Sequence, residues 1–377
     1  MFAQVHLKAC PSYDLGTVRA AVRDILARCE GIQPLLRPGA TVLLKPNVVN
    51  PQPPDRPICT HPSVVRAVAE VVREAGCEII VADQPCYAMT RTAEYAFGVP
   101  GYVEALRDLP ADLRLLNAGG YEHVPVERPF HLQEVVVSRL VLQVDVVISL
   151  WKCKTHLQTL YTGAVKNMFG ALAPKARLGA HAVGPGRAMG RAVVDIYSTC
   201  VQHLALMDAV IGMEGPGPTA GAAHHVGLLA GSLDAVAVDA VVANVVWFAP
   251  GEVAPTQYAA ERGLGCGDLA NIQVTGDDLA DFRTRFVRPP ALHARMPGVL
   301  NRVGRHFVYC RPIVAPDQCV GCGGCKQVCP GDAIKITKRA LIDRRACLDC
   351  YCCIEACPHH AIKVSRSWLS KVLSPAV

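Results

Sequence analysis

The stretch Val144-Asp145-Val146-Val147-Ile148-Ser149-Leu150 is a nearly continuous apolar run, and Trp151-Lys152-Cys153-Lys154-Thr155-His156 follows it directly. A run without polar alternation is typical of a strand that is covered on both faces, as in a parallel sheet. Four further runs of this kind lie at 41–44, 77–82, 204–207 and 226–230. These runs predict a sheet of buried strands in the N-terminal part of the chain.

Helical periodicity separates these apolar runs. One apolar face consists of Val18, Ala21, Val22, Ile25, Leu26 and Cys29, and a second of Val65, Val68, Val72 and Ala75. Pro62-Ser63 stands where the second helix would begin, and Gly76 where it would end. The alternation of strand and helix predicts an α/β domain in which helices cover a parallel sheet.

The C-terminal quarter contains one cysteine pattern twice. Cys319-x2-Cys322-x2-Cys325-x3-Cys329-Pro330 recurs 28 residues later as Cys347-x2-Cys350-x2-Cys353-x3-Cys357-Pro358. This spacing is the signature of bacterial ferredoxins with two [4Fe-4S] clusters, in which the fourth cysteine of each run binds the other cluster. Zinc sites also use Cys-x2-Cys pairs, but zinc does not require eight cysteines in two such runs.

The pattern predicts which cysteines bind each cluster, because two-residue gaps place three thiolates around one corner of a cubane. Cluster one is expected to use Cys319, Cys322, Cys325 and Cys357, and cluster two Cys347, Cys350, Cys353 and Cys329. Cys352 does not fit the spacing and is interpreted as a bystander. The remaining cysteines are expected to be buried small apolar residues: 10, 29, 59, 77, 86, 153, 200, 266 and 310.

The composition changes after residue 283, where seven arginines are spread along a stretch with Pro289-Pro290 and Pro297. We therefore expect an α/β domain at 1–285, a connector at 286–315, a small α+β ferredoxin-like domain at 316–366 and a tail at 367–377. The arginines could form a docking surface for an acidic electron-transfer partner, or simply a solvated linker face.

The overall composition excludes several classes of protein. Of 377 residues, 51% are hydrophobic and 19% charged, and the formal net charge is +6. Two oxidised clusters with their thiolates would lower this charge to about +2, and no basic helix interleaved with aromatics indicates nucleic-acid binding. No apolar stretch reaches the roughly 20 residues of a membrane span, and no signal peptide is evident. We expect a cytoplasmic protein.

Polar residues follow the predicted strands. Because ligands of parallel α/β sheets bind beyond the carboxyl ends of the strands, these residues are candidates for a site. Several lysines there would attract an anionic small molecule such as a carboxylate or phosphate. His156 could act as acid or base, or bind a metal with Asp208 or with His224-His225. The candidate catalytic residues are Lys45, Lys152, Lys154, His156 and Asp208.

Several of these segments resemble one known family. Lys45-Pro46-Asn47, Thr60-His61-Pro62, the block from Lys152-x-Lys154-Thr155-His156 to Lys166-Asn167-x-Phe169-Gly170, and Glu214-Gly215-Pro216 are similar to "domain of unknown function 362". The resemblance covers about 40–285 together with the cysteine module. It implies an iron–sulfur protein with an appended ferredoxin module, and it implies no particular substrate.

Three functions fit the sequence. The first is an oxidoreductase that relays single electrons between two [4Fe-4S] clusters and an anionic substrate, supplied by a redox partner protein. In that case Cys153, between two lysines, is expected to have a lowered pKa. The second is an electron carrier or accessory protein that docks a redox partner without chemistry of its own. The third is an anion-binding transferase or isomerase with structural clusters.

Overall fold

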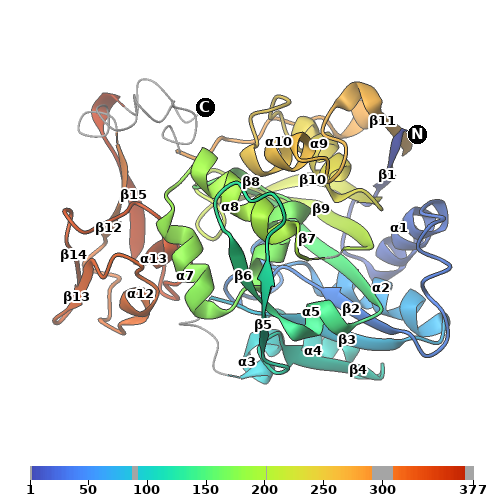
Figure 1. Cartoon of the computed structure of the whole chain (residues 1–377), viewed down its shortest axis with the longest axis horizontal. Coiled ribbons are helices and arrows are strands. Elements are labelled where there is room, and N and C mark those ends of the chain that lie inside the picture. The colour runs from blue at the N-terminus through green and yellow to red at the C-terminus, as the bar shows by residue number, and fades with distance from the viewer. Residues whose placement is uncertain (1, 87–91, 201, 291–308, 370–377) are drawn as a thin grey trace.

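The computed structural model describes residues 2–86, 92–200, 202–290 and 309–369. A large sheet lies between two layers of helices, and the cysteine-rich C-terminal module packs at one end of the molecule (Figure 1). Within these ranges, no helix is long and apolar enough to cross a bilayer.

The main sheet has the order β11-β1-β10-β9-β7-β2-β3-β4, and the short β8 pairs with β7. Strands β4, β3, β2, β7 and β9 are mutually parallel, whereas β10 is antiparallel to both of its neighbours. The predicted α/β fold is therefore confirmed, but the sheet is mixed rather than purely parallel. The strands of the main sheet are β1 (Ala3–Ala9), β2 (Thr41–Lys45), β3 (Glu78–Asp83), β4 (Ala111–Leu115), β7 (Val146–His156), β8 (Leu160–Thr162), β9 (Leu204–Glu214), β10 (Ala222–Ser232) and β11 (Ile272–Gly276).

Strand β7 is the central element of the site. All eleven of its residues are buried, including Lys152, Lys154 and His156. The sequence predicted that these residues follow a strand ending at Leu150, and this was wrong, because the strand continues to His156. Asp208 likewise lies inside β9 rather than after it. Both strands run beyond their apolar stretches because the lysines and Asp208 find partners within the protein.

Helices cover both faces of the sheet. On one face α1, α2, α3 and α4 bury their apolar sides against β2, β3 and β7. On the other face α6, α8, α9 and α10 pack against the same sheet, together with the β5–β6 hairpin. The helices and the hairpin are α1 (Leu15–Arg28), α2 (Pro62–Glu74), α3 (Ala93–Gly98), α4 (Tyr102–Leu106), β5 (Tyr121–Pro125), β6 (Glu134–Ser138), α5 (Arg139–Gln143), α6 (Ala164–Asn167), α7 (Pro174–Ala182), α8 (Arg187–Tyr197), α9 (Ala235–Val245) and α10 (Ala254–Glu261).

The ends of α2 show how local sequence sets an element. His61, rather than Pro62-Ser63, is the N-cap, and its Nδ1 accepts from the backbone N–H of Ser63 at 3.2 Å. Pro62 takes the first helical position, where its missing N–H costs nothing. The predicted stop is confirmed at Gly76, whose φ of 78° is left-handed and favours glycine.

The C-terminal module contains two short sheets and two short helices. Its elements are β12 (Cys310–Val314), α12 (Gly324–Gln327), β13 (Ile334–Ile336), β14 (Ala340–Ile342), α13 (Cys352–Glu355) and β15 (Ile362–Arg366). Strand β12 pairs with β15, so the module begins inside the predicted connector. The central part of that connector, with Arg295, Arg302 and Arg305, lies outside the described residues, as does the tail from 370.

Candidate functional site

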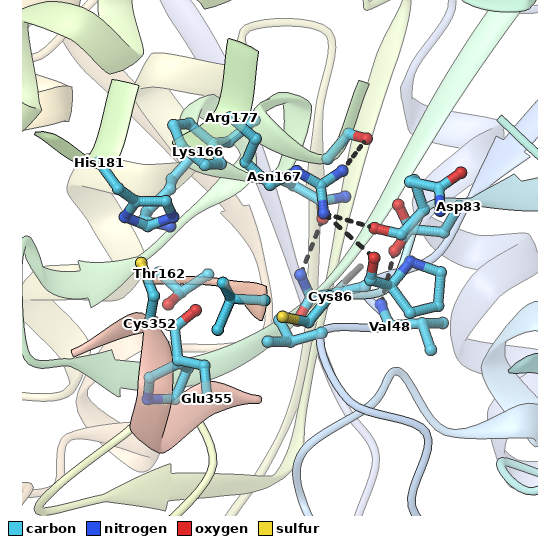
Figure 2. A pocket seen from close by; sticks show the side chains of 18 of the residues that line it. Val48, Asp83, Cys86, Thr162, Lys166, Asn167, Arg177, His181, Cys352 and Glu355 are labelled. Atoms are coloured by element: carbon cyan, nitrogen blue, oxygen red, sulfur yellow. Dashed lines mark hydrogen bonds between the residues drawn. The ribbon is translucent and has the colours of Figure 1, made fainter. Parts of the chain in front are cut away.

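A cavity of about 80 Å³ lies where the module packs against the α/β domain. This volume holds several water molecules and hence a small organic or inorganic anion. One wall comes from the ends of β2 and β3, a second from β7, β8 and α6, and a third from α7. The fourth wall is α13 of the cysteine module, so the cavity is shared by both domains (Figure 2).

Several contacts hold the module against the α/β domain. The Asn50 side-chain amide donates to the backbone carbonyl of Glu355 at 3.3 Å. Nη1 of Arg56 donates to Nε2 of His360 at 2.7 Å. Cys86 and Leu178 of the α/β domain pack against the apolar group that contains Cys352. These contacts position α13 as a fixed wall of the cavity.

Lys45 occupies the floor at the end of β2. Its Nζ donates to Oδ1 of Asp83 at 2.7 Å, while Oδ2 of Asp83 accepts from the backbone of Val48. Burial lowers the pKa of Lys45, and the Asp83 carboxylate opposes that shift. A Cβ at Gly170 would lie 2.8 Å from Oδ1 of Asp83, so only glycine admits this close approach.

Asn167 extends the floor. Its Oδ1 accepts from the side-chain amide of Asn47 at 2.9 Å, and its Nδ2 donates to Ser149 at 3.0 Å. The Asn residues of the predicted Lys45-Pro46-Asn47 and Lys166-Asn167 segments thus meet in space. Oδ1 of Asn47 is buried without a hydrogen-bond partner in the described part of the chain.

His156 faces the cysteine module. The backbone N–H of Gln158 donates to its Nδ1 at 3.0 Å, so the neutral ring carries its proton on Nε2. That Nε2 lies 3.6 Å from Oε1 of Glu355 on α13. Burial lowers the pKa of His156 well below its ordinary value and raises the pKa of Glu355. The two groups are therefore a neutral imidazole beside a carboxyl group rather than an ion pair.

His181 lies across the cavity from α13. Its Nδ1 is 2.9 Å from Oε1 of Gln158, which can only accept, so Nδ1 donates and Nε2 is left as an acceptor. Burial lowers the pKa of His181 well below its ordinary value. Figure 2 shows the His181 ring facing the sulfur of Cys352. The cavity thus contains two neutral imidazoles of opposite hydrogen-bonding character.

Two cations at the cavity offer donors to a ligand. Lys166 is half-buried, and its ammonium lies 4.9 Å from the centre of the Phe169 ring. Burial lowers its pKa, and Glu355 opposes that shift. Arg177 donates to the carbonyls of Gln84, Pro85 and Gly170, but its buried Nε has no described partner. An anion in the cavity would satisfy these donors.

Lys152 and Asp208 form a separate network outside this cavity. Nζ of Lys152 donates to Oδ2 of Asp208 at 2.9 Å and to the Tyr13 hydroxyl, which itself donates to Oδ1 of Asp208 at 2.8 Å. The Tyr13 ring stacks on His61 with centroids 3.6 Å apart. The structure therefore divides the predicted lysine cluster into two separate places.

Lys154 and Cys153 are both completely buried in β7, and burial shifts the pKa of each. Lys154 donates to the carbonyl of Ile58 at 2.7 Å, and burial lowers its pKa to about 7. The predicted lowering of the Cys153 pKa was wrong, because complete burial raises it to about 12. The proposed metal partners of His156 are also apart from it. His224 hydrogen-bonds Glu214 and Thr284, and His225 donates to Pro11.

The first cysteine loop surrounds a small cavity of about 20 Å³, lined by Cys319, Cys322, Cys325 and Cys357. Burial raises the pKa of Cys325 to about 11, with smaller contributions from its three neighbouring thiols. Backbone N–H groups point at two of these sulfurs, from Ala340 to Cys319 at 3.4 Å and from Ala361 to Cys357 at 3.3 Å. Thiols around a common cavity with N–H···S bonds fit a [4Fe-4S] cluster.

The second cysteine loop contains three of the four cysteines expected to bind cluster two. Burial raises the pKa of Cys353, and Cys350, Cys347, Cys325 and Cys329 contribute in the same direction. The backbone N–H of Ala333 donates to the Cys329 sulfur at 3.2 Å. Cys357, the fourth cysteine of the second run, thus lines one cavity with the first three cysteines of the first run, and Cys329 lies near Cys353. Both positions fit the exchange expected from the spacing.

Sequence reasoning missed four cavity residues: Arg177, His181, Cys352 and Glu355. A signal for two of them was present in the repeat. At the offset of 28, Cys352 corresponds to Gly324 and Glu355 to Gln327. The second copy therefore carries a thiol and a carboxyl group where the first carries neither, and both face the cavity. The expected bystander Cys352 is a wall residue. Three of the other cysteines, 77, 86 and 266, are only partly buried.

The chain is similar to one curated protein and to one solved structure. The thylakoid-associated protein sll1697 of Synechocystis sp. (strain ATCC 27184 / PCC 6803 / Kazusa) is 34% identical over 274 residues, covering 72% of this chain and 82% of that protein. The lactate racemase apoprotein of Thermoanaerobacterium thermosaccharolyticum aligns with a TM-score of 0.41 and 11% identity, over 63% of this chain and 55% of that one.

Two families match the sequence itself. Residues 311–358 match the 4Fe-4S dicluster domain, and residues 42–244 match the family described as "Domain of unknown function (DUF362)". The second match covers more than half of the chain, and it contains β2, β7 and α6 with their site residues. The protein is therefore a member of the DUF362 family with a C-terminal 4Fe-4S dicluster domain.

Proposed function

We propose that the protein is an iron–sulfur oxidoreductase that relays single electrons between two [4Fe-4S] clusters and a small anion bound in the shared cavity. The observation that carries this proposal is the position of α13. This helix begins within the second cysteine run and forms one wall of the cavity, with Cys352 and Glu355 on its surface. A ligand in the cavity would therefore lie beside the cysteines assigned to cluster two.

The cations of the cavity support an anionic ligand. Lys45 is neutralised by Asp83, but Lys166 and Arg177 face only one further carboxyl group, that of Glu355. The buried Nε of Arg177 has no partner among the described residues, which is costly in a buried site, and an anion would supply one. Lys154 lies close enough for its charge to influence Glu355 and adds to the positive potential.

We assign the cluster ligands as the spacing predicts: Cys319, Cys322, Cys325 and Cys357 for cluster one, and Cys347, Cys350, Cys353 and Cys329 for cluster two. When bound, the clusters supply one-electron transfer at the cavity wall. Of the five candidate residues, we assign Lys45 and His156 to the cavity, Lys154 to its surroundings, and the Lys152–Asp208 pair to the fold. Nε2–H of His156 would donate a hydrogen bond to a bound ligand, and the Glu355 carboxyl group, whose pKa is raised by burial, would supply the proton to a ligand that gains an electron.

The test begins with anaerobic purification of the full chain. We expect about eight iron and eight sulfide per chain, four of each per cluster, and mass spectrometry should identify a small anion released on denaturation. That anion, added back to dithionite-reduced protein, should reoxidise the clusters. Lys166→Met should weaken anion binding by about ten- to hundredfold and slow this reoxidation accordingly, while keeping its iron.

The alternatives predict different results. A carrier without chemistry of its own would retain no anion, and its reoxidation would be the same in the Lys166→Met variant. A transferase or isomerase with structural clusters would convert the anion equally well with oxidised and reduced clusters. An iron count well below eight would contradict the two-cluster assignment itself.

A further inference from the structure

The two cysteine loops differ in exposure. In the first loop Cys322 is exposed and Val320 has 64% of its surface accessible. In the second loop Cys350, Cys352 and Cys353 are buried. Figure 1 places β13 and β14 at the outer edge of the molecule, whereas α13 lies next to α7 of the α/β domain. Cys322 of the first loop is therefore the most exposed of the eight cysteines, whereas α13 of the second loop lies beside the cavity.

A basic hairpin loop lies against the first cysteine loop. The backbone N–H of Ala340, at the start of β14, donates to the Cys319 sulfur at 3.4 Å. A Cβ at Gly321 would lie 2.7 Å from the carbonyl oxygen of Lys338. Lys338 and Arg339, in the turn between β13 and β14, are both exposed. Two exposed positive charges thus border the solvent side of the first cluster site.

The wider surface of the module has the same sign. Residues 309–369 contain nine Lys and Arg against five Asp and Glu, and one of those five, Glu355, is buried at the cavity. Two oxidised clusters with their thiolates would lower the charge of the module as a whole by about four, so the positive sign of the face at the first loop comes locally from the exposed Lys338 and Arg339. A surface of this sign steers an acidic protein toward it and repels a basic one.

We propose that the face formed by Val320, Cys322, Lys338 and Arg339 is the docking surface for an acidic one-electron carrier protein. This inference rests on the proposed function, because it needs a cluster in the first site. The exposed Val320 supplies an apolar contact within a basic surround, as is typical of small transient interfaces. One electron leaves the reduced carrier and the first cluster gains it, so the carrier is oxidised by one electron and no bond changes.

The proposal also gives the electron path a direction through the module. The carrier contacts the first cluster site, and the buried second site faces the cavity, so electrons cross the module from its outer edge to α13. The α/β domain need not contact the carrier. The binding surface for the carrier and the binding site for the anion are therefore separable by mutation.

The test uses the full-length holoprotein under anaerobic conditions and two acidic carriers, a flavodoxin and a plant-type ferredoxin, with the basic cytochrome c as a third probe. Calorimetry measures Kd at low and high salt. We expect at least one acidic carrier to bind, with affinity that falls as salt rises, and cytochrome c to bind more weakly. The double variant Lys338→Glu/Arg339→Glu should raise the Kd for the acidic carrier by about tenfold or more.

A matched control reverses two exposed charges elsewhere, Arg37→Glu/Arg73→Glu, and should leave Kd unchanged. Iron content and reduction by dithionite should stay at wild-type values in both variants. Equal binding by wild type and Lys338→Glu/Arg339→Glu, an equal loss in the control, or no binding of either acidic carrier would overturn the docking surface alone. Absence of iron from the wild type would instead overturn the proposed function.

Discussion

Lys152 and Lys166 are both lysines of the α/β domain, but Lys152 is buried and Lys166 is half-buried. Lys152 is paired with Asp208 and Tyr13, and every polar atom of that group has a partner. The Lys166 ammonium faces the Phe169 ring, and Glu355 and Thr162 at the same cavity each have a buried oxygen without a hydrogen-bond partner among the described residues. A closed network stabilises a fold, whereas an incompletely satisfied one is prepared for a ligand. The contrast predicts a structural role for Lys152 and a ligand-binding role for Lys166.

The largest expected effect is on the closed network. Asp208→Ala leaves the Lys152 ammonium buried without its carboxylate, so the free energy of unfolding should fall by about 3–5 kcal/mol. Urea unfolding monitored by circular dichroism measures this change. The apolar double variant Lys152→Met/Asp208→Leu should recover most of the loss. A loss below about 1 kcal/mol in Asp208→Ala would mean that the network is not structural.

The open site should respond in the opposite way. Lys166→Met removes an ammonium whose pKa is already lowered by burial, so stability should be unchanged or slightly higher. Affinity for the retained anion should fall by about ten- to hundredfold, as loss of a charged hydrogen bond implies. Equilibrium dialysis of the purified anion measures it. Lys175→Met, an exposed lysine on α7, serves as the control and should bind normally.

Asp239 tests whether a carboxylate with good hydrogen bonds is still penalised by burial. It accepts from the backbone of Ala164 and Val165 at the start of α6, and burial raises its pKa to about 7. The folded state therefore holds a proton that the unfolded state has lost, and stability falls as pH rises through 7. We expect the free energy of unfolding to be about 1 kcal/mol higher at pH 6 than at pH 8.

The variant Asp239→Asn should flatten that part of the pH profile, because an amide does not titrate. Unfolding by urea at pH 6, 7 and 8 compares the two proteins. A profile that stays as steep as in the wild type would assign the pH dependence to another group.

The smallest effect is expected at Cys352. Cys352→Ser should keep about eight iron per chain, with a stability change below about 1 kcal/mol, because the thiol faces the cavity and is outside the ligand spacing. Its neighbour provides the contrast, since Cys353→Ser should lose one cluster. Iron analysis of both variants decides the assignment, and loss of iron from Cys352→Ser would contradict it.

The sequence predicted which segments form strands better than it predicted whether neighbouring strands are parallel or antiparallel. The apolar run at 226–230 indicated a buried strand, and β10 is one, but burial leaves the same pattern whether a neighbour runs parallel or antiparallel. The cysteine spacing carried more information, because ligand geometry restricts both position and identity. These restrictions allowed the dicluster module to be predicted from the sequence alone.

The site itself was only partly predictable. Lys45 and His156 were found because they stand in a family-like pattern next to apolar runs. The pairing of Lys152 with Asp208 and Tyr13 was not predictable, because these residues come from distant parts of the chain. Glu355 and Cys352 belong to a different domain from the other walls, and only packing of the module brings them to Lys166 and His181.

The cavity wall formed by α13 has a consequence for the fusion of the two domains in one chain. Because α13 closes a cavity whose other walls come from the α/β domain, neither part contains a whole site. Two separate polypeptides would have to meet each time and would lose translational and rotational freedom on association. Fusion in one chain replaces that encounter with a high effective concentration. Every copy therefore carries one dicluster module for one cavity, at a fixed one-to-one ratio.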